Sequence, residues 1–309
     1  MRQDRLTRRD FLKRAIVLGA AAYGLASQDG LTGRDGLAEA AEGPTLAVAA
    51  KSHDPAVLTR AAVTALGGMG RFVKKGSVVL IKPNMAWNRK PEHAATTNPQ
   101  VVAELVRLCR AAGAREIRVV DHPVDQPEAV VVRTTGIAEA VEAAGARVFS
   151  ASSRAMYGPM QLPRAKVLKS AEVLKDVTRA DVFINVPIAK VHGATGVTLG
   201  CKNLMGVVWD RGAWHDSAGL DQCIADFAGA VKPHLVVLDA VRLLLTNGPK
   251  GPGRTKDLFQ VVAGTDPVAV DAYGATLLSR KPESIGHIRL AHALGLGEMD
   301  LKQVKIKHV

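Results

Sequence analysis

Cysteine is scarce in this sequence of 309 residues, in which only Cys109, Cys201 and Cys223 occur. No Cys-x-x-Cys pair is present, so the chain alone cannot supply the four thiolates of a common iron–sulfur cluster or of a Cys₄ zinc site. We therefore expect no cysteine-ligated iron–sulfur cluster within this chain. Because the number of thiols is odd, at least one of them stays unpaired within a monomer.

Aromatic residues are also few, at 4% of the chain, and no run of Lys and Arg exceeds two residues. The formal charge of +12 would by itself suggest nucleic acid, since clustered Lys and Arg bind phosphates irrespective of sequence. However, zinc-finger and RNA-recognition signatures are absent, and we expect no nucleic-acid partner. The basic excess instead indicates a small anionic molecule or a negatively charged envelope surface.

The N-terminus lacks a hydrophobic run long enough to span a bilayer comfortably, since its apolar stretch extends only from Ala15 to Ala26. Arg8-Arg9 and Phe11 precede that stretch as in a twin-arginine export signal, and Ala38-Glu39-Ala40 follows it as a small-residue cleavage pattern. We expect residues 1–40 to be a signal peptide read by the twin-arginine export machinery. The mature protein would then be periplasmic or otherwise extracytoplasmic; the alternative is a basic amphipathic N-terminal helix.

Hydrophobic residues make up 47% of the chain, enough for a buried core, and they occur as short runs that alternate with helical patterns. Helix starts are predicted at Asp54, Asn98 and Asp266, where a capping side chain precedes proline. Strands are expected over residues 46–50, 78–81, 117–120, 148–149, 182–186, 235–238 and 259–263. Helices are expected over residues 55–66, 99–112, 137–144, 197–205, 220–230, 267–278 and 283–294.

This rhythm predicts an α/β fold, with a mostly parallel sheet covered by helices on both faces. No convincing linker interrupts residues 41–309, which we expect to form a single domain. Residues 150–175 are the least regular segment and predict a small irregular or β-rich insertion.

The most informative stretch runs from Asp181 to Gly206, because polar residues follow a continuous apolar run there. Lys190 and His192 come after the strand predicted over residues 182–186, and Lys202 and Asn203 follow a glycine-rich turn. Ligands of open α/β sheets bind outside the carboxyl ends of the strands. This pattern favours a site over a solvated loop followed by an amphipathic helix.

Other predicted strands are also followed by polar residues. Lys82 and Asn84 follow residues 78–81, Asp121-His122 follows residues 117–120, and Asp239 follows residues 235–238. A parallel sheet would bring several of these groups to one crevice. Asp266 is better explained as a helix cap.

Three loops add candidates. The loop over residues 84–98 is long and polar, which is typical of functional loops. The glycine-rich loop over residues 247–253 lacks the Walker pattern but can offer backbone N–H groups to an anion. Residues 209–216 hold two Trp residues, His215 and Asp216, and predict a lid or an anchored surface loop.

Several of these motifs, in this order and over nearly all of the mature chain, resemble family 362 of the domains of unknown function. The family is sometimes joined to ferredoxin-type iron–sulfur modules, so the resemblance implies a redox association. This chain has no such module, and any cluster would reside on a separate iron–sulfur partner protein. The resemblance implies an α/β fold and a site, without an established reaction. The motifs are Lys82-Pro83-Asn84, Thr96-Thr97-Asn98-Pro99, Ile184-Asn185-Val186-Pro187 with Lys190-Val191-His192, Lys202-Asn203-Leu204-Met205-Gly206, His215, Asp239 with Asn247-Gly248-Pro249, and the segment from Asp266 to Ala272.

Two function classes follow from these residues. In the first and favoured class, the protein is an enzyme acting on a small carboxylate or phosphate. Its substrate would be bound by Lys82, Asn84, Lys202 and Asn203. Its catalytic residues would be Lys190, His192 as general acid or base, and Asp239, which would orient His192 or hold a metal.

The alternative is a carrier without turnover, working with a separate iron–sulfur protein. His192, His215 and Asp216 would then hold a divalent metal or another cofactor of unknown identity. These residues fit both classes, so whether the protein is an enzyme stays open at this point.

Overall fold

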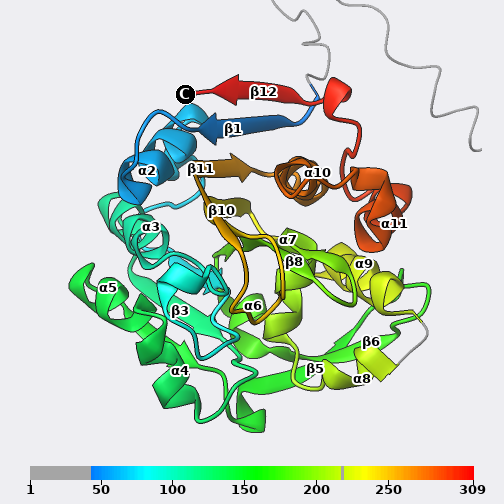
Figure 1. Cartoon of the computed structure of the whole chain (residues 1–309). Helices are drawn as coiled ribbons and strands as arrows, with labels where there is room; N and C mark the ends of the chain where they lie inside the picture. Colours follow the sequence, from blue (N-terminus) through cyan, green and yellow to red (C-terminus); the bar gives the residue numbers. More distant parts are fainter. Residues whose placement is uncertain (1–42, 217–218) are drawn as a thin grey trace, which may run out of the picture. The chain divides into compact units, whose positions relative to one another are not determined.

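The computed structural model shown in Figure 1 describes residues 43–216 and 219–309. The expected twin-arginine signal, residues 1–40, therefore lies outside the described residues. Within the described part of the chain, no helix combines the length and apolar character needed to cross a bilayer.

A mixed sheet of ten strands organises the described residues. Most of its strands form where β-branched and other apolar residues run together, as expected for strands buried on both faces. They are β1 (Thr45–Ala49), β2 (Val78–Pro83), β3 (Glu116–Asp121), β4 (Arg147–Ser150), β7 (Val182–Val186), β8 (Ile188–His192), β9 (Gly196–Thr198), β10 (Leu235–Leu244), β11 (Thr255–Gly264) and β12 (Lys305–His308).

The spatial order of the strands is β12-β1-β11-β10-β7-β2-β3-β4. All neighbouring pairs from β10 to β4 are parallel, and β12 is parallel to β1. Only β11, between β1 and β10, and β9, beside β8, pair in the antiparallel sense. The expected mostly parallel sheet is therefore confirmed.

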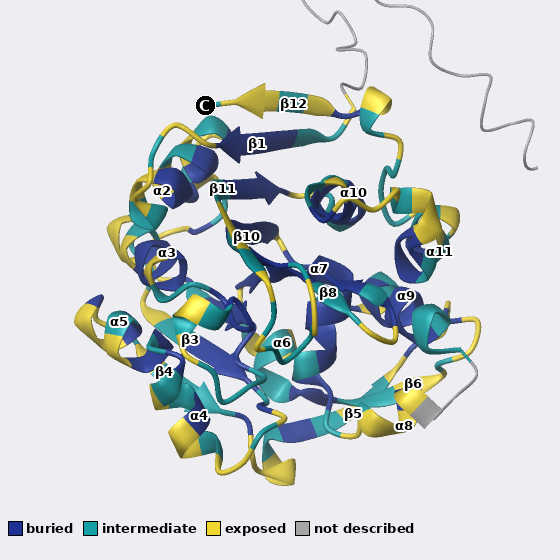
Figure 2. Cartoon of the chain, in the orientation of Figure 1, coloured by how far each residue is buried: buried dark blue, intermediate teal, exposed yellow. Residues whose placement is uncertain are grey.

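Helices cover both faces of this sheet. Since successive residues of each strand point to opposite faces, alternate residues pack against different helices. On one face α2, α3 and α5 pack against alternate strand residues such as Val79 and Val237. On the other face α9, α10 and α11 pack against the intervening residues, such as Leu80 and Val236. Figure 2 shows the inner strand β10 largely buried and the edge strand β12 largely exposed, and β11 is buried along its C-terminal part. The helices of the described residues are α2 (Pro55–Ala65), α3 (Pro99–Ala111), α4 (Glu128–Thr134), α5 (Ile137–Ala143), α6 (Lys175–Arg179), α7 (Gly200–Asn203), α8 (Gly212–Asp216), α9 (Leu220–Ala230), α10 (Pro267–Leu277) and α11 (Gly286–Ala293).

The three predicted helix caps are confirmed. The side chains of Asp54 and Asp266 each accept two backbone N–H groups at the starts of α2 and α10, and Asn98 accepts one at the start of α3. The β-rich insertion is confirmed as well: β5 (Tyr157–Gln161) and β6 (Ser170–Leu174) form a separate antiparallel pair.

The helix expected over residues 197–205 is wrong in its first half. Gly196 adopts a positive φ of 75°, which turns the chain so that β9 pairs back onto β8. The helix begins only at Gly200 and continues as a 3₁₀ turn over Leu204–Val207. The segment over residues 209–216, expected as a loop, contains the short helix α8.

Candidate active site

A cavity of about 590 Å³ lies at the carboxyl ends of β2 and β3. This space is the central cavity of the protein. Clefts of this size typically hold small molecules. Most of the predicted site residues line it, namely Lys82, Asn84, Lys190, His192, Lys202, Asn203 and His215, and Asp121, His122, Trp209 and Arg211 join them.

Lys82, at the end of β2, forms a buried ion pair with Asp121, at the end of the neighbouring strand β3. Its Nζ lies 2.7 Å from Asp121 Oδ1, and the two side chains are 1% and 2% exposed. Lys82 Nζ also donates to the carbonyl oxygen of Pro83 at 2.6 Å and to Asn203 Oδ1 at 3.1 Å. Burial lowers the pKa of Lys82, and the Asp121 carboxylate opposes that shift.

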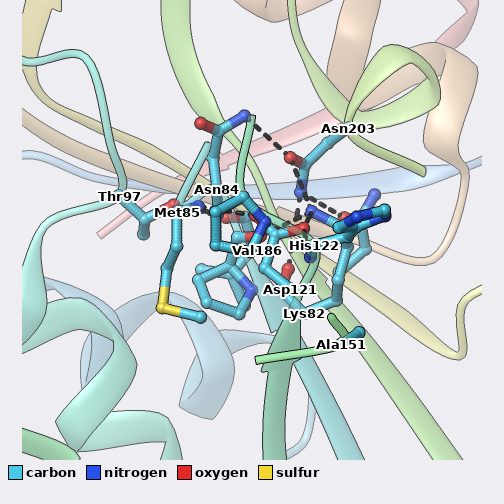
Figure 3. Close-up of polar contacts among 12 residues, drawn as sticks. Lys82, Asn84, Met85, Thr97, Asp121, His122, Ala151, Val186 and Asn203 are labelled. Carbon is cyan, nitrogen blue, oxygen red and sulfur yellow. Dashed lines mark hydrogen bonds and ion pairs between the residues drawn. The ribbon is translucent and has the colours of Figure 1, made fainter. Parts of the chain in front are cut away.

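Hydrogen bonds join the buried side-chain amides of Asn84, Asn203 and Asn185 into an amide relay. The relay connects Lys82 with Lys190, and Figure 3 shows the part of it around Asn84 and Asn203. Asn185 donates to the carbonyl oxygen of Gly200 at 2.9 Å and accepts from Asn203 Nδ2 at 2.8 Å. Asn203 Oδ1 in turn accepts from Asn84 Nδ2 at 2.9 Å. Because the first acceptor is a carbonyl, the orientation of each amide along the relay is determined.

Lys190 lies on β8, where its side chain is 1% exposed and lines the cavity. Its Nζ donates to Asn84 Oδ1 at 3.2 Å and to the carbonyl oxygen of Ala95. Burial lowers the pKa of Lys190 to about 7; Asp121 opposes this shift, and the charges of Lys82 and Lys202 add to it.

Lys202 is held in place through helix α7. Asp271 of α10 accepts the backbone N–H groups of Gly200 and Cys201, at 2.6 and 2.8 Å, and so caps the start of this helix. Lys202 Nζ contacts Met205 Sδ at 3.4 Å and forms no ion pair with a described carboxylate. Burial lowers the pKa of Lys202 to about 8, an effect that Asp221 opposes and Arg211 reinforces.

Arg211 and His122 form one wall of the cavity. The sequence indicated His122, which follows a predicted strand, but did not single out Arg211. One guanidinium nitrogen of Arg211 donates to the carbonyl oxygens of His122 and Pro123, at 2.9 and 3.1 Å. Its Nη1, like the hydroxyl of Thr198, is buried without a partner among the described residues. The ring of His122 stacks on Trp209, with centroids 5.3 Å apart. Unpartnered donors beside an aromatic wall are typical of ligand sites.

His192 lies on the same side of β8 as Lys190, two residues further on, and its ring faces that of His215 with centroids 6.4 Å apart. Its Nδ1 accepts the backbone N–H of Ala194 at 3.1 Å. Burial lowers the pKa of His192 to about 3, and the charges of Lys202 and Lys190 lower it further. The imidazole is therefore neutral at physiological pH, with its proton on Nε2.

The expected metal site has only part of its ligand set in the described structure. His192 and His215 both line the cavity, whereas the side chain of Asp216 lies outside the described residues. Among the described residues, no three His, Cys, Asp or Glu side chains come together as a metal-binding group.

Asp239 is not among the residues that line the cavity. Its carboxylate accepts the backbone N–H groups of Asn98, at 2.7 Å, and Val241, at 2.9 Å. Burial raises the pKa of Asp239 to about 6, and these two hydrogen bonds oppose the shift. In this position Asp239 anchors the end of the loop over residues 84–98, and Thr97, which accepts from the Asn84 N–H, anchors its beginning.

Two of the predicted functional loops meet beside the cavity. Lys250, in the loop over residues 247–253, forms an ion pair with Asp125 at 2.8 Å and lies over the ring of Trp87. Arg89 donates to the carbonyl oxygen of Gly251 at 3.4 Å. Trp87 and Pro249 both line the cavity, so these loops form part of its wall.

Sequence patterns missed the roles of Asp121, Arg211 and Asn185. Asp121 carried a signal, since it follows a predicted strand in the same way as Lys82. Arg211 carried a signal only as part of the segment over residues 209–216, expected as a lid or a surface loop, and its position depends on the 3₁₀ turn that follows α7.

The chain is similar to the thylakoid-associated protein sll1697 of Synechocystis sp., with 29% identity over 238 residues that cover 75% of this chain and 72% of the relative. A solved structure, the lactate racemase apoprotein from Thermoanaerobacterium thermosaccharolyticum, is similar with a TM-score of 0.49 and 11% identity. That match covers 74% of this chain and 56% of the other, so this chain spans just over half of that structure.

The sequence pattern of a family described as "Domain of unknown function (DUF362)" matches residues 79–276. The matched segment covers more than half of the 309 residues and includes β3, β8, α7 and all of β2 except Val78, the elements that carry the central cavity. The protein therefore belongs to the DUF362 family.

Proposed function

We propose that this protein is an enzyme that acts on a small anionic substrate, a carboxylate or a phosphate ester, in the central cavity. One observation carries the proposal: Lys82, Lys190, Lys202 and Arg211 line the cavity, against the single carboxylate of Asp121 among its described lining residues. Asp121 is already paired with Lys82. Lys202 and the free nitrogen of Arg211 are left with donors that an anionic ligand would satisfy.

The remaining groups supply proton chemistry. His192, neutral with its proton on Nε2, would donate a hydrogen bond to a substrate oxygen on which negative charge develops. Lys190, whose pKa lies near neutrality, would accept or return a proton. The buried relay of Asn84, Asn203 and Asn185 would hold these groups in position without moving during the reaction.

Thermal unfolding in the presence of small anions tests the proposal. Inorganic phosphate, glycerol phosphate, succinate and citrate are titrated onto the protein in chloride buffer. A bound anion at a hundredfold excess over its dissociation constant stabilises the fold by about 2.7 kcal/mol. Lys202→Met should abolish the response to the active anion, whereas Lys281→Met, at an exposed position, should retain it. Equal responses of wild type and Lys202→Met would refute the anion site.

A carrier that binds a divalent metal is the second candidate, and the facing rings of His192 and His215 favour it. Two imidazoles supply nitrogen ligands suited to Zn²⁺, Ni²⁺ or Cu²⁺. Calorimetric titration of these ions distinguishes the candidates: binding that His215→Ala removes, with no response to anions, would support the carrier.

We also propose that the mature protein is exported by the twin-arginine machinery. The Arg8-Arg9 motif, Phe11 and the short apolar stretch after them support this proposal.

A further inference from the structure

The three lysines of the central cavity differ in the acceptors that surround them. An ammonium group has three N–H bonds to donate, whereas a neutral amine has two and keeps a lone pair. Lys82 Nζ has three acceptors: the carboxylate of Asp121, the carbonyl oxygen of Pro83 and Asn203 Oδ1. This set matches an ammonium group.

Among the residues that the structure describes, Lys190 Nζ has two acceptors, both uncharged: Asn84 Oδ1 and the carbonyl oxygen of Ala95. It forms no ion pair with any carboxylate of the described residues, although its side chain is 1% exposed. A buried ammonium without a counterion is costly. Two neutral acceptors match the two N–H bonds of a neutral amine instead.

The amide relay excludes the opposite orientation of Asn84. If Asn84 presented its Nδ2 to Lys190, its Oδ1 would face Asn203 Oδ1, because Asn203 directs its own Nδ2 to Asn185. Asn185 is oriented by the carbonyl oxygen of Gly200, which can only accept. The structure therefore orders four groups so that an acceptor reaches Lys190, and both of its amine hydrogens are used.

We propose that Lys190 is a nucleophile that forms an imine with the aldehyde or keto group of an anionic substrate. This inference rests on the proposed function, since Lys202 and Arg211 would hold the carboxylate or phosphate of that substrate. The lone pair of Nζ forms a bond to the carbonyl carbon as the C=O π bond opens onto oxygen. A proton then passes from nitrogen to that oxygen, and loss of one water molecule leaves the imine. No oxidant or reductant is required.

His192 lies two residues from Lys190 on the same side of β8 and lines the same cavity. Its Nε2–H is placed to donate to the carbonyl oxygen while the lone pair attacks. Donation at oxygen and attack at carbon are the two requirements of carbinolamine formation, and adjacent inward positions of one strand meet them.

Pyridoxal 5′-phosphate, an aldehyde that carries a phosphate, is a suitable probe. Protein from which the probe is omitted serves as the blank, and the imine is reduced with sodium borohydride and located by peptide mass spectrometry. We expect one label per chain on Lys190, formed roughly tenfold or more faster than on any exposed lysine such as Lys281. Lys190→Met should lose this label, and Lys281→Met should keep it.

A second variant guards against a folding defect in Lys190→Met. Asn84→Asp keeps the shape of the side chain but places a carboxylate beside Nζ, which converts the amine to an ammonium and should slow the labelling of Lys190 at least several-fold. Because this change also removes the donor to Asn203 Oδ1, thermal unfolding first verifies that the variant is folded. Labels spread over surface lysines, or Asn84→Asp labelling as fast as wild type, would overturn the inference.

The two proposals fail in distinguishable ways. If inorganic phosphate stabilises the wild type but Lys190 stays unlabelled, only the nucleophile is wrong. If Lys190 reacts equally fast with propanal, which carries no anion, and excess phosphate gives no protection, only the anion site is wrong.

Discussion

Lys82 Nζ lies 2.7 Å from Asp121 Oδ1 at the ends of two adjacent parallel strands, with both side chains almost completely buried. Lys82 is also held by Asn203, and Asp121 accepts the backbone N–H of Met85 at 2.6 Å. The ion pair therefore connects β2, β3 and α7 beneath the central cavity. It supports the positions of Asn84 and Asn203 rather than supplying a free charge to a ligand.

We expect Asp121→Asn to lower the free energy of unfolding by about 3–5 kcal/mol, because it leaves the buried Lys82 ammonium without its counterion. The double variant with Lys82→Met should recover part of this loss, since no unpaired charge remains. Urea unfolding measures both. The exposed pair Arg154–Glu172 is the control, and removing Glu172 should cost less than about 1 kcal/mol. Equal losses at the two pairs would contradict this account.

Gly206→Ala should disturb the same ion pair by steric overlap. A Cβ at this position would lie 2.2 Å from Asp121 Oδ1 and 2.6 Å from Lys82 Cε. We expect a loss of about 1–3 kcal/mol in unfolding free energy, together with a weaker response to anions. Gly70→Ala is the matched control, because a Cβ there meets nothing within 4 Å. A stable Gly206→Ala protein would show that the ion pair can shift at little cost.

Lys202→Met should stabilise the empty protein in a pH-dependent manner. The pKa of Lys202 is lowered from 10.5 to about 8, so between these values the unfolded chain binds more protons and wild-type stability rises with pH. Below pH 8 the folded protein bears the full cost of the buried charge. Removing it should add about 3 kcal/mol at pH 7, and the gain should vanish as the pH approaches 10.5.

Urea unfolding in chloride buffer at several pH values measures this gain, with Lys281→Met as the control for loss of an exposed lysine. A gain of the same size at pH 7 and pH 10 would show that packing, not charge, is responsible. A loss of anion binding that accompanies the gain in stability would be typical of a residue selected for function.

The proposed export depends on residues 1–40, which lie outside the described structure. Changing both Arg8 and Arg9 to Lys should leave the full-length precursor in the cytoplasm, because the machinery reads the arginine pair. Cell fractionation followed by immunoblotting measures the distribution, and a single change at Arg2 is the control. Unimpaired export of the double variant would exclude the twin-arginine route.

Local sequence determined the main elements of this fold. Short Val, Ile and Leu runs placed most strands of the sheet, and a capping residue before proline placed the starts of α2, α3 and α10. These features depend on neighbours within a few residues, and so they can be read from the chain. The polar residues at the strand ends were recognisable for the same reason, because parallel strands bring their carboxyl ends to one edge.

Only the tertiary structure decided what each polar group does there. Lys82 and Asp121 are 39 residues apart, and nothing local indicates that they pair or that Asp239 turns to the Asn98 backbone instead of the cavity. The short strands β8 and β9 were missed because a few residues give no reliable periodicity. The lowered pKa values of Lys82, Lys190 and Lys202 arise from burial and from charged groups on distant segments, because desolvation and nearby charges in the folded chain determine how readily an amine is protonated.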